Sequence, residues 1–115
     1  MTHRTTRPWI PRSFQMLHRK VAVVGDDKMT IENLAGQSCN SEARIRLDPC
    51  GFKHMSEQEA ASIFWHELWH TMCSVMAWKD VGKDEAMADQ FGGAMAQFMD
   101  SADWRPPNGI EKRKG

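Results

Sequence analysis

The residues of this chain best suited to chemistry are His66, Glu67 and His70, which form a His-Glu-x-x-His sequence. On a helix the two histidines project from one face with side chains about 6 Å apart, so both can bind one metal ion. Glu67 lies about 100° round the helix from His66 and approaches that metal from the side. A zinc hydrolase needs this arrangement, because zinc acidifies a bound water and the carboxylate takes up its proton during attack on a carbonyl.

A catalytic zinc site needs a third protein ligand and one open position. Glu85 is the best candidate, because it lies fifteen residues after His70 at the start of the next predicted helix. Asp89, one turn later, is placed to accept a hydrogen bond from the other ring nitrogen of a ligating histidine. Cys73 shares the histidine stripe but lies about 10 Å along the helix from His66, which excludes it as a ligand of the same ion. The alternative for the two acids is a solvated helix N-terminus.

Two predicted helices position these side chains. Ser56 and Glu59 form a capping box, which predicts a helix from about residue 57 to about residue 78, followed by a break over 79–83. Its apolar side chains fill a broad arc, which predicts a central and largely buried helix; they are Phe64, Trp65, Leu68, Trp69, Met72, Val75 and Met76.

The second helix is predicted from about residue 84 to about residue 100. Glu85, Asp89, Gly92 and Ala96 fall in one line along it. A helical glycine costs about 1 kcal/mol relative to alanine, so Gly92 indicates that another backbone approaches closely there. The side chains that flank this line are predicted to supply core; they are Phe91, Met95, Phe98 and Met99.

Short strands are predicted ahead of the helices. Residues 13–17 and 20–24 predict a hairpin that turns at His18-Arg19, and residues 34–39 and 43–47 predict a second hairpin around 40–42. Residues 29–34 fit either a strand or a helical turn. The fold class predicted is α+β, with a small antiparallel or mixed sheet of short strands followed by an active-site helix and a glutamate helix.

The second hairpin also carries a burial prediction. Ile45 and Leu47 alternate with Arg44 and Arg46, which is typical of a sheet with one solvated face. The segment 48–51, Asp-Pro-Cys-Gly, is predicted to end the sheet, because proline removes a ladder donor and glycine permits a turn.

Composition limits the classes of partner and compartment. The chain has 115 residues and is predicted to form an irregular basic lead over 1–12, a single domain over 13–104 and a flexible basic tail over 105–115. Its formal net charge is zero, which argues against nucleic acid or membrane as the main partner. Three cysteines without a C-x-x-C pair and the lack of a long apolar stretch favour free thiols in the cytoplasm.

The two motifs together resemble the gluzincin metallopeptidases. His66-Glu67-Leu68-Trp69-His70 followed by Glu85-Ala86-Met87-Ala88-Asp89 is similar to the gluzincin pattern H-E-x-x-H then E-x-x-x-D. The short gap and the small domain resemble the minigluzincins and the compact metallopeptidases encoded by phages and prophages, over roughly residues 13–100. The resemblance implies a minimal zincin fold over 13–104 and a bacterial or phage-infected host cell.

The resemblance also implies roles for particular residues. His66, His70 and Glu85 would bind one zinc ion, Glu67 would act as general base and acid, and Asp89 would support the ligands. A protein or peptide substrate would lie along the sheet edge near residues 34–39 by strand addition.

One departure from the family concerns the oxyanion. Larger gluzincins use a tyrosine or histidine outside these motifs to stabilise it, and this chain has no tyrosine. His18 and His54 are the histidines of the predicted domain that remain for this role.

The leading hypothesis is a zinc-dependent endopeptidase. The alternative is a non-enzymatic module in which zinc staples two helices and the partner is another protein or nucleic acid. Glu67 argues against the staple, because a structural site has no use for a base beside the metal. A metal-free helical core with a chance motif is the third possibility.

Overall fold

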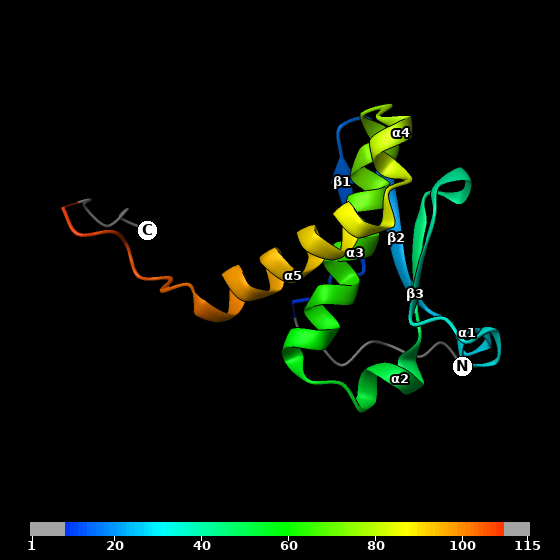
Figure 1. Ribbon diagram of the computed structural model, residues 1–115, viewed down its shortest axis with the longest axis horizontal. Coiled ribbons are helices and arrows are strands. Elements are labelled where there is room, and N and C mark those ends of the chain that lie inside the picture. Colours follow the sequence, from blue (N-terminus) through cyan, green and yellow to red (C-terminus); the bar gives the residue numbers. More distant parts are fainter. Residues whose placement is uncertain (1–8, 110–115) are drawn as a thin grey trace.

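The computed structural model describes residues 9–109, and these form an α+β fold with a mixed four-stranded sheet followed by helices, as predicted (Figure 1). The strands are β1 (Ser13–Met16), β2 (Arg19–Gly25), β3 (Gly36–Cys39) and β4 (Arg44–Leu47). The helices are α1 (Lys28–Glu32), α2 (Pro49–Lys53), α3 (Glu57–Val75), α4 (Lys79–Gly82) and α5 (Glu85–Ser101), and the 3-10 turn η1 (Asn40–Glu42) joins β3 to β4. The ends of the chain predicted as basic lead and tail lie largely outside the described residues.

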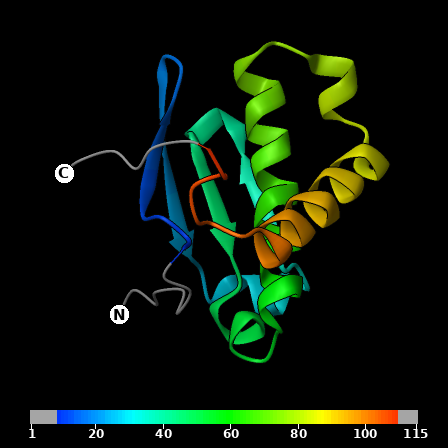
Figure 2. The same cartoon turned by 90° about the vertical axis from the view of Figure 1, so that its left-hand side faces the viewer.

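The sheet has the strand order β1-β2-β4-β3, so β3 is an edge strand. Both predicted hairpins are confirmed, because β1 pairs with β2 and β3 with β4 in antiparallel register, while β2 and β4 run parallel. The first turn lies one residue earlier than predicted, since Leu17 adopts a left-handed conformation with φ 51°. Figure 2 shows the strands as one layer with α3 and α5 on the same side of it.

The structure contains two short helices that the sequence analysis did not firmly predict. Residues 28–32 form α1, which ends at Asn33 in the left-handed region. The segment 48–51 ends the sheet as predicted, since β4 stops at Leu47. It also starts α2, which was not predicted, because the side chain of Asp48 accepts a hydrogen bond from the backbone of Cys50 and Pro49 occupies the first turn. An N-cap acid before proline is a helix-start signal.

The prediction of a solvated sheet face is wrong at Arg46, which is only 8% exposed. Its Nε donates to Asp26 Oδ2 at 2.9 Å, its Nη2 to Glu32 Oε1 at 2.6 Å and its Nη1 to Gln37 Oε1 at 2.5 Å. These bonds to three acceptors on neighbouring elements let the guanidinium be buried at low cost. The pKa of Arg46 is raised by Glu32 and Asp26.

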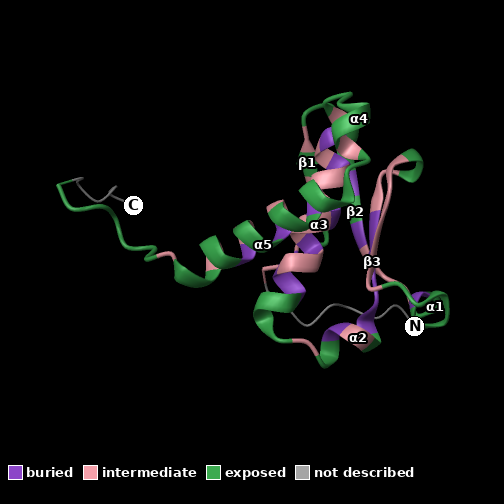
Figure 3. Cartoon of the chain, in the orientation of Figure 1, coloured by how far each residue is buried: buried purple, intermediate pink, exposed green. Residues whose placement is uncertain are grey.

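Helix α3 begins at the predicted capping box, where Ser56 Oγ accepts from the backbone of Glu59 at 3.1 Å. It ends at Val75, earlier than predicted, since Ala77 turns left-handed at φ 61°. The helix is largely buried, as predicted, because one face meets the sheet and another meets α5: from Ala60 to Val75 every residue except Ser74 is buried or half-buried (Figure 3). Met76, which was expected in its apolar arc, lies past the end of the helix and is 41% exposed. The predicted break over 79–83 contains the short helix α4.

The core lies between α3 and the sheet. Its buried members are Ile10, Val21, Val23, Ile45, Leu47, Phe52, Ala60 and Phe64. Trp9 packs edge-on against Phe64 with ring centroids 6.0 Å apart, and its Nε1 donates to Glu57 Oε2 at 2.8 Å. Among residues 9–109, no helix is long and apolar enough to cross a membrane.

Helix α5 packs against α3 through a stripe of small residues. A Cβ placed on Gly92 would lie 2.4 Å from the carbonyl oxygen of Ser62 and 3.1 Å from the backbone nitrogen of His66. The close backbone approach predicted at Gly92 is therefore confirmed. The prediction that Phe98 supplies core is wrong, because this side chain is 53% exposed and its ring contacts Trp104, itself 70% exposed.

Candidate metal centre

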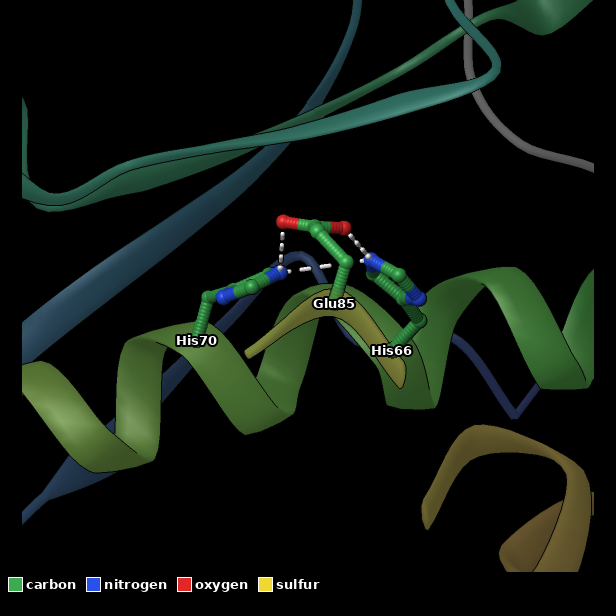
Figure 4. Close-up of side chains that lie close together, drawn as sticks. All are labelled: His66, His70 and Glu85. Carbon is green, nitrogen blue, oxygen red and sulfur yellow. Dashed lines mark hydrogen bonds and ion pairs between the residues drawn. The ribbon is translucent and has the colours of Figure 1, made fainter. Parts of the chain in front are cut away.

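His66 and His70 project from consecutive turns of α3 toward Glu85, which stands in the first turn of α5 (Figure 4). Glu85 Oε2 lies 3.1 Å from His66 Nε2, and Glu85 Oε1 lies 3.1 Å from His70 Nε2. The two Nε2 atoms are 3.2 Å apart. The close packing at Gly92 brings the start of α5 to the histidine face, so the three residues predicted as ligands do converge.

The other nitrogen of each imidazole is held by a hydrogen-bond acceptor. His70 Nδ1 lies 2.7 Å from the carbonyl oxygen of Gly82, and His66 Nδ1 lies 2.7 Å from Asp89 Oδ1. A carbonyl and an ionised carboxylate only accept, so both Nδ1 atoms carry the hydrogen. The Nε2 lone pairs are therefore left to face Glu85 and one another.

These distances match the donor set of a zinc ion. Zinc–nitrogen and zinc–oxygen bonds of about 2.0–2.1 Å in a tetrahedron put neighbouring ligand atoms about 3.3 Å apart. The separations here are 3.1 to 3.2 Å. Lone pairs and a carboxylate this close together repel one another unless a cation or protons lie between them. Within the described part of the chain, this is the group of acids, histidines and cysteines that could hold a metal ion.

Glu67 lies beside the three ligands and is 8% exposed. Its Oε2 is 3.9 Å from His66 Nε2. Burial raises the pKa of Glu67 above its usual value, with the charge of Glu85 acting in the same direction, while His66, His70 and the Ser38 N–H oppose the shift. A buried carboxylate with a raised pKa is suited to take up and release a proton.

A cleft of about 460 Å³ opens over the histidines between α3 and β3. Its lining residues are Leu34, Gly36, Gln37, Ser38, Asn40, His66, Glu67, His70, Gly82, Lys83 and Glu85. A Cβ on Gly36 would lie 3.0 Å from the Cγ of Glu67 and 3.1 Å from the Cγ2 of Ile63. Glycine at this position therefore lets the edge strand lie against the helix that carries the site.

Several site residues were missed by the sequence analysis. The carbonyl of Gly82 orients His70, and a Cβ on Gly82 would lie 2.8 Å from the Cβ of Cys73. A backbone carbonyl that accepts a hydrogen bond leaves no signal in the sequence. The glycine at position 82 is explained by the short distance between the backbone of α4 and the side chain of Cys73 on α3. Cys73 itself is buried, which raises its pKa, and it packs under α4 rather than joining the ligands.

The histidines considered for the oxyanion lie elsewhere. His18 is exposed in the turn between β1 and β2, and His54 is exposed at the end of α2. Neither lines the cleft. Polar donors that do line it are Gln37, Ser38, Asn40 and Lys83, none of which the sequence analysis considered for this role.

The chain was compared with protein-family models, with curated proteins and with solved structures, and no match was found. Its function is therefore inferred from the chemistry of the site itself.

Proposed function

We propose that this protein is a zinc-dependent metallopeptidase that hydrolyses peptide bonds in an extended protein or peptide segment. The observation that carries the proposal is the convergence of His66, His70 and Glu85 next to a buried carboxylate, Glu67, on the floor of an open cleft. Both imidazoles present a bare Nε2, and a structural metal would have no use for an adjacent proton acceptor.

The donor set fits zinc, which when bound supplies Lewis acidity that polarises a carbonyl and acidifies water. Glu67 then accepts a proton from the attacking water and passes it to the leaving amine, a transfer that a carboxylate with a raised pKa performs well near neutral pH. Asp89 and the Gly82 carbonyl hold the Nδ1 hydrogens, so the ligand atoms keep their direction through the reaction.

The substrate lies along the outer edge of β3. The carbonyl of Ala35 accepts from the backbone of Asp48 at 3.0 Å, so residue 35 faces β4. Hydrogen-bonding direction alternates along an antiparallel strand, and the backbone groups of Gly36 and Ser38 therefore face the cleft. An extended peptide pairs with such an edge by strand addition, which suits a flexible or unfolded segment.

The cellular setting proposed is the cytoplasm of a bacterium or of a phage-infected host cell. Cys39, Cys50 and Cys73 are all unpaired, which suits a reducing compartment. The setting in bacteria or phages rests on the resemblance to minigluzincins alone.

The proposal is tested by replacing Glu67 with glutamine and measuring both zinc content and cleavage of fluorescein-labelled casein. Glu67→Gln should keep one zinc ion per chain, because Glu67 is not a ligand, and should lose cleavage. Glu59→Gln on the same helix is the matched control, since a capping box accepts either residue. If Glu67→Gln cleaves casein at the wild-type rate, the mechanism is refuted. If the wild-type protein binds no zinc when zinc is supplied at neutral pH, the metal site is refuted.

The alternative, a zinc staple between α3 and α5, makes a different prediction. Chelation lowers the melting temperature in either case, because both helices contribute ligands. A peptidyl hydroxamate competes for an open metal position, so it should inhibit casein cleavage by an enzyme. A zinc-loaded protein that neither cleaves casein nor binds the hydroxamate would favour the staple.

A further inference from the structure

Asn40 lines the cleft at the point where the edge strand ends, and it is not explained by the metal site. The backbone groups that face the cleft belong to residues 36 and 38, and the next residue in this alternation is Asn40. At Asn40 the chain leaves the extended conformation and enters η1. Its backbone carbonyl is occupied, because it accepts from Arg19 Nη1 at 2.8 Å and from the backbone of Ala43 at 3.3 Å.

The side chain of Asn40 is oriented by a chain of hydroxyl groups. Ser38 Oγ donates to Asn40 Oδ1 at 2.8 Å, and Ser38 Oγ also lies 2.9 Å from Thr71 Oγ1. A serine hydroxyl has a single hydrogen, so Thr71 must be the donor in its bond with Ser38. Thr71 is 2% exposed on α3, directly after the ligand His70, so the chain begins on a rigid element.

This direction of donation determines which end of the amide is available. The oxygen of Asn40 is used by Ser38, and no group within residues 9–109 accepts from its Nδ2. The amide nitrogen therefore has two hydrogens available for a ligand. The residue itself is fixed in place, because its backbone carbonyl and its Oδ1 both accept hydrogen bonds. A donor fixed in advance costs little ordering when it meets an acceptor.

We propose that Asn40 is a substrate-binding residue whose side-chain amide donates a hydrogen bond to a main-chain carbonyl oxygen of the peptide lying along β3. The inference rests on the proposed function. A peptide extended past Ser38 runs beyond the last ladder donor of the edge strand, because β3 ends at Cys39 and the chain turns into η1 at Asn40. The amide of Asn40 supplies the donor that the strand no longer provides at that position.

The test uses the zinc-loaded protein and a defined probe, benzyloxycarbonyl-Ala-Gly-Leu-Ala with the Gly-Leu amide replaced by a phosphonamidate. Asn40→Asp keeps the acceptor for Ser38 and nearly the same shape, and it removes only the donor. Asn40→Ala removes both, and Ser41→Ala, an exposed neighbour in η1, is the matched control. Calorimetry gives probe affinity, and zinc content and melting temperature are measured in parallel.

Asn40→Ala should bind the probe about 2- to 12-fold more weakly, the range of one neutral hydrogen bond. Asn40→Asp should lose at least as much, because a carboxylate repels a carbonyl oxygen, while its zinc content and melting temperature stay near wild type. Ser41→Ala should bind like wild type. Unchanged affinity in both Asn40 variants would overturn this inference and leave the proposed function standing.

A second series of probes separates direct contact from a structural effect. Each member replaces one remaining amide by an (E)-alkene, which removes a carbonyl oxygen and keeps the shape. One member should bind wild type and Asn40→Ala equally, because the partner of the amide is gone. An effect of Asn40→Ala that persists with every member would overturn the inference. A zinc-loaded wild type that binds no phosphonamidate would overturn the proposed function itself.

Discussion

Gly92 and Gly93 provide two chemically identical substitutions with opposite expected effects. Both glycines lie inside α5, so changing either to alanine removes the same backbone entropy from the unfolded chain and gains about 1 kcal/mol of helix propensity. A Cβ on Gly93 would meet nothing within 4 Å. Gly93→Ala should therefore raise the free energy of unfolding by about 0.5–1 kcal/mol.

The same methyl group on Gly92 has no room. It would lie 2.4 Å from the carbonyl oxygen of Ser62 and 3.3 Å from the Cβ of His66, whereas atoms in favourable contact are about 3.5–4.0 Å apart. The backbone of α3 cannot rotate away like a side chain, so α5 must move outward by about 1 Å. Overpacking of this kind costs about 1–3 kcal/mol.

The propensity term cancels between the two variants, so their difference isolates the steric effect. Gly92→Ala should be less stable than Gly93→Ala by about 1–3 kcal/mol in urea unfolding, or by about 4–8 °C in melting temperature for each kcal/mol.

Glu85 and Asp89 move with α5, so zinc affinity should also fall in Gly92→Ala, by about 10- to 100-fold as when groups that orient metal ligands are lost. Competition with a fluorescent chelator measures the affinity. Equal stability and equal zinc affinity in the two variants would refute the close packing of α3 and α5 at this position.

Three further predictions follow from other contacts. Asp89→Ala frees the His66 ring and should weaken zinc binding by about 10- to 100-fold, whereas Asp100→Ala on the exposed end of α5 should not change the chelator titration. Arg46→Met removes the hydrogen bonds that Arg46 donates to Asp26, Glu32 and Gln37 and should lower the free energy of unfolding by about 1–2 kcal/mol in urea; no loss would contradict the role of this network. The Lys28 backbone N–H and Arg46 lower the pKa of Asp26 below its ordinary 3.8, so its stabilisation is complete above that value and is lost as the pH falls through the lowered pKa. The stability gap between wild type and Asp26→Asn should accordingly close between neutral and strongly acidic pH in urea titrations, and a constant gap would contradict the shift.

Local signals in the sequence predicted much of the fold. The capping box at Ser56 and the alternation in both hairpins involve residues that are close along the chain, so the prediction needs no knowledge of tertiary contacts. Gly92 was informative for a related reason. Its cost inside a helix is intrinsic, which indicated a compensating contact before the partner was known.

Most of the errors have a different cause, since they depend on which surface a neighbour covers. Arg46 is buried because acceptors on three other segments reach it, and neither their identity nor their approach is visible in the alternation of β4. Phe98 stays exposed because α3 covers only one face of α5, and Met76 stays exposed because it lies past the end of α3. Helix α3 ends early at a left-handed alanine, for which propensity offers no signal.

The candidate site also has one part that local sequence predicted and another that depends on tertiary contacts. The four-residue spacing of His66 and His70 placed two imidazoles on one face, because helix geometry is a property of the local backbone. The meeting with Glu85, the acceptors that orient each ring and the edge strand that borders the cleft depend on contacts between residues far apart in the chain. Asn40 became recognisable only in this way, because its free donor follows from a chain of hydroxyls that begins on α3. The residue types therefore determine which atoms can bind a metal ion, whereas the packing of the helices determines that these atoms lie close together.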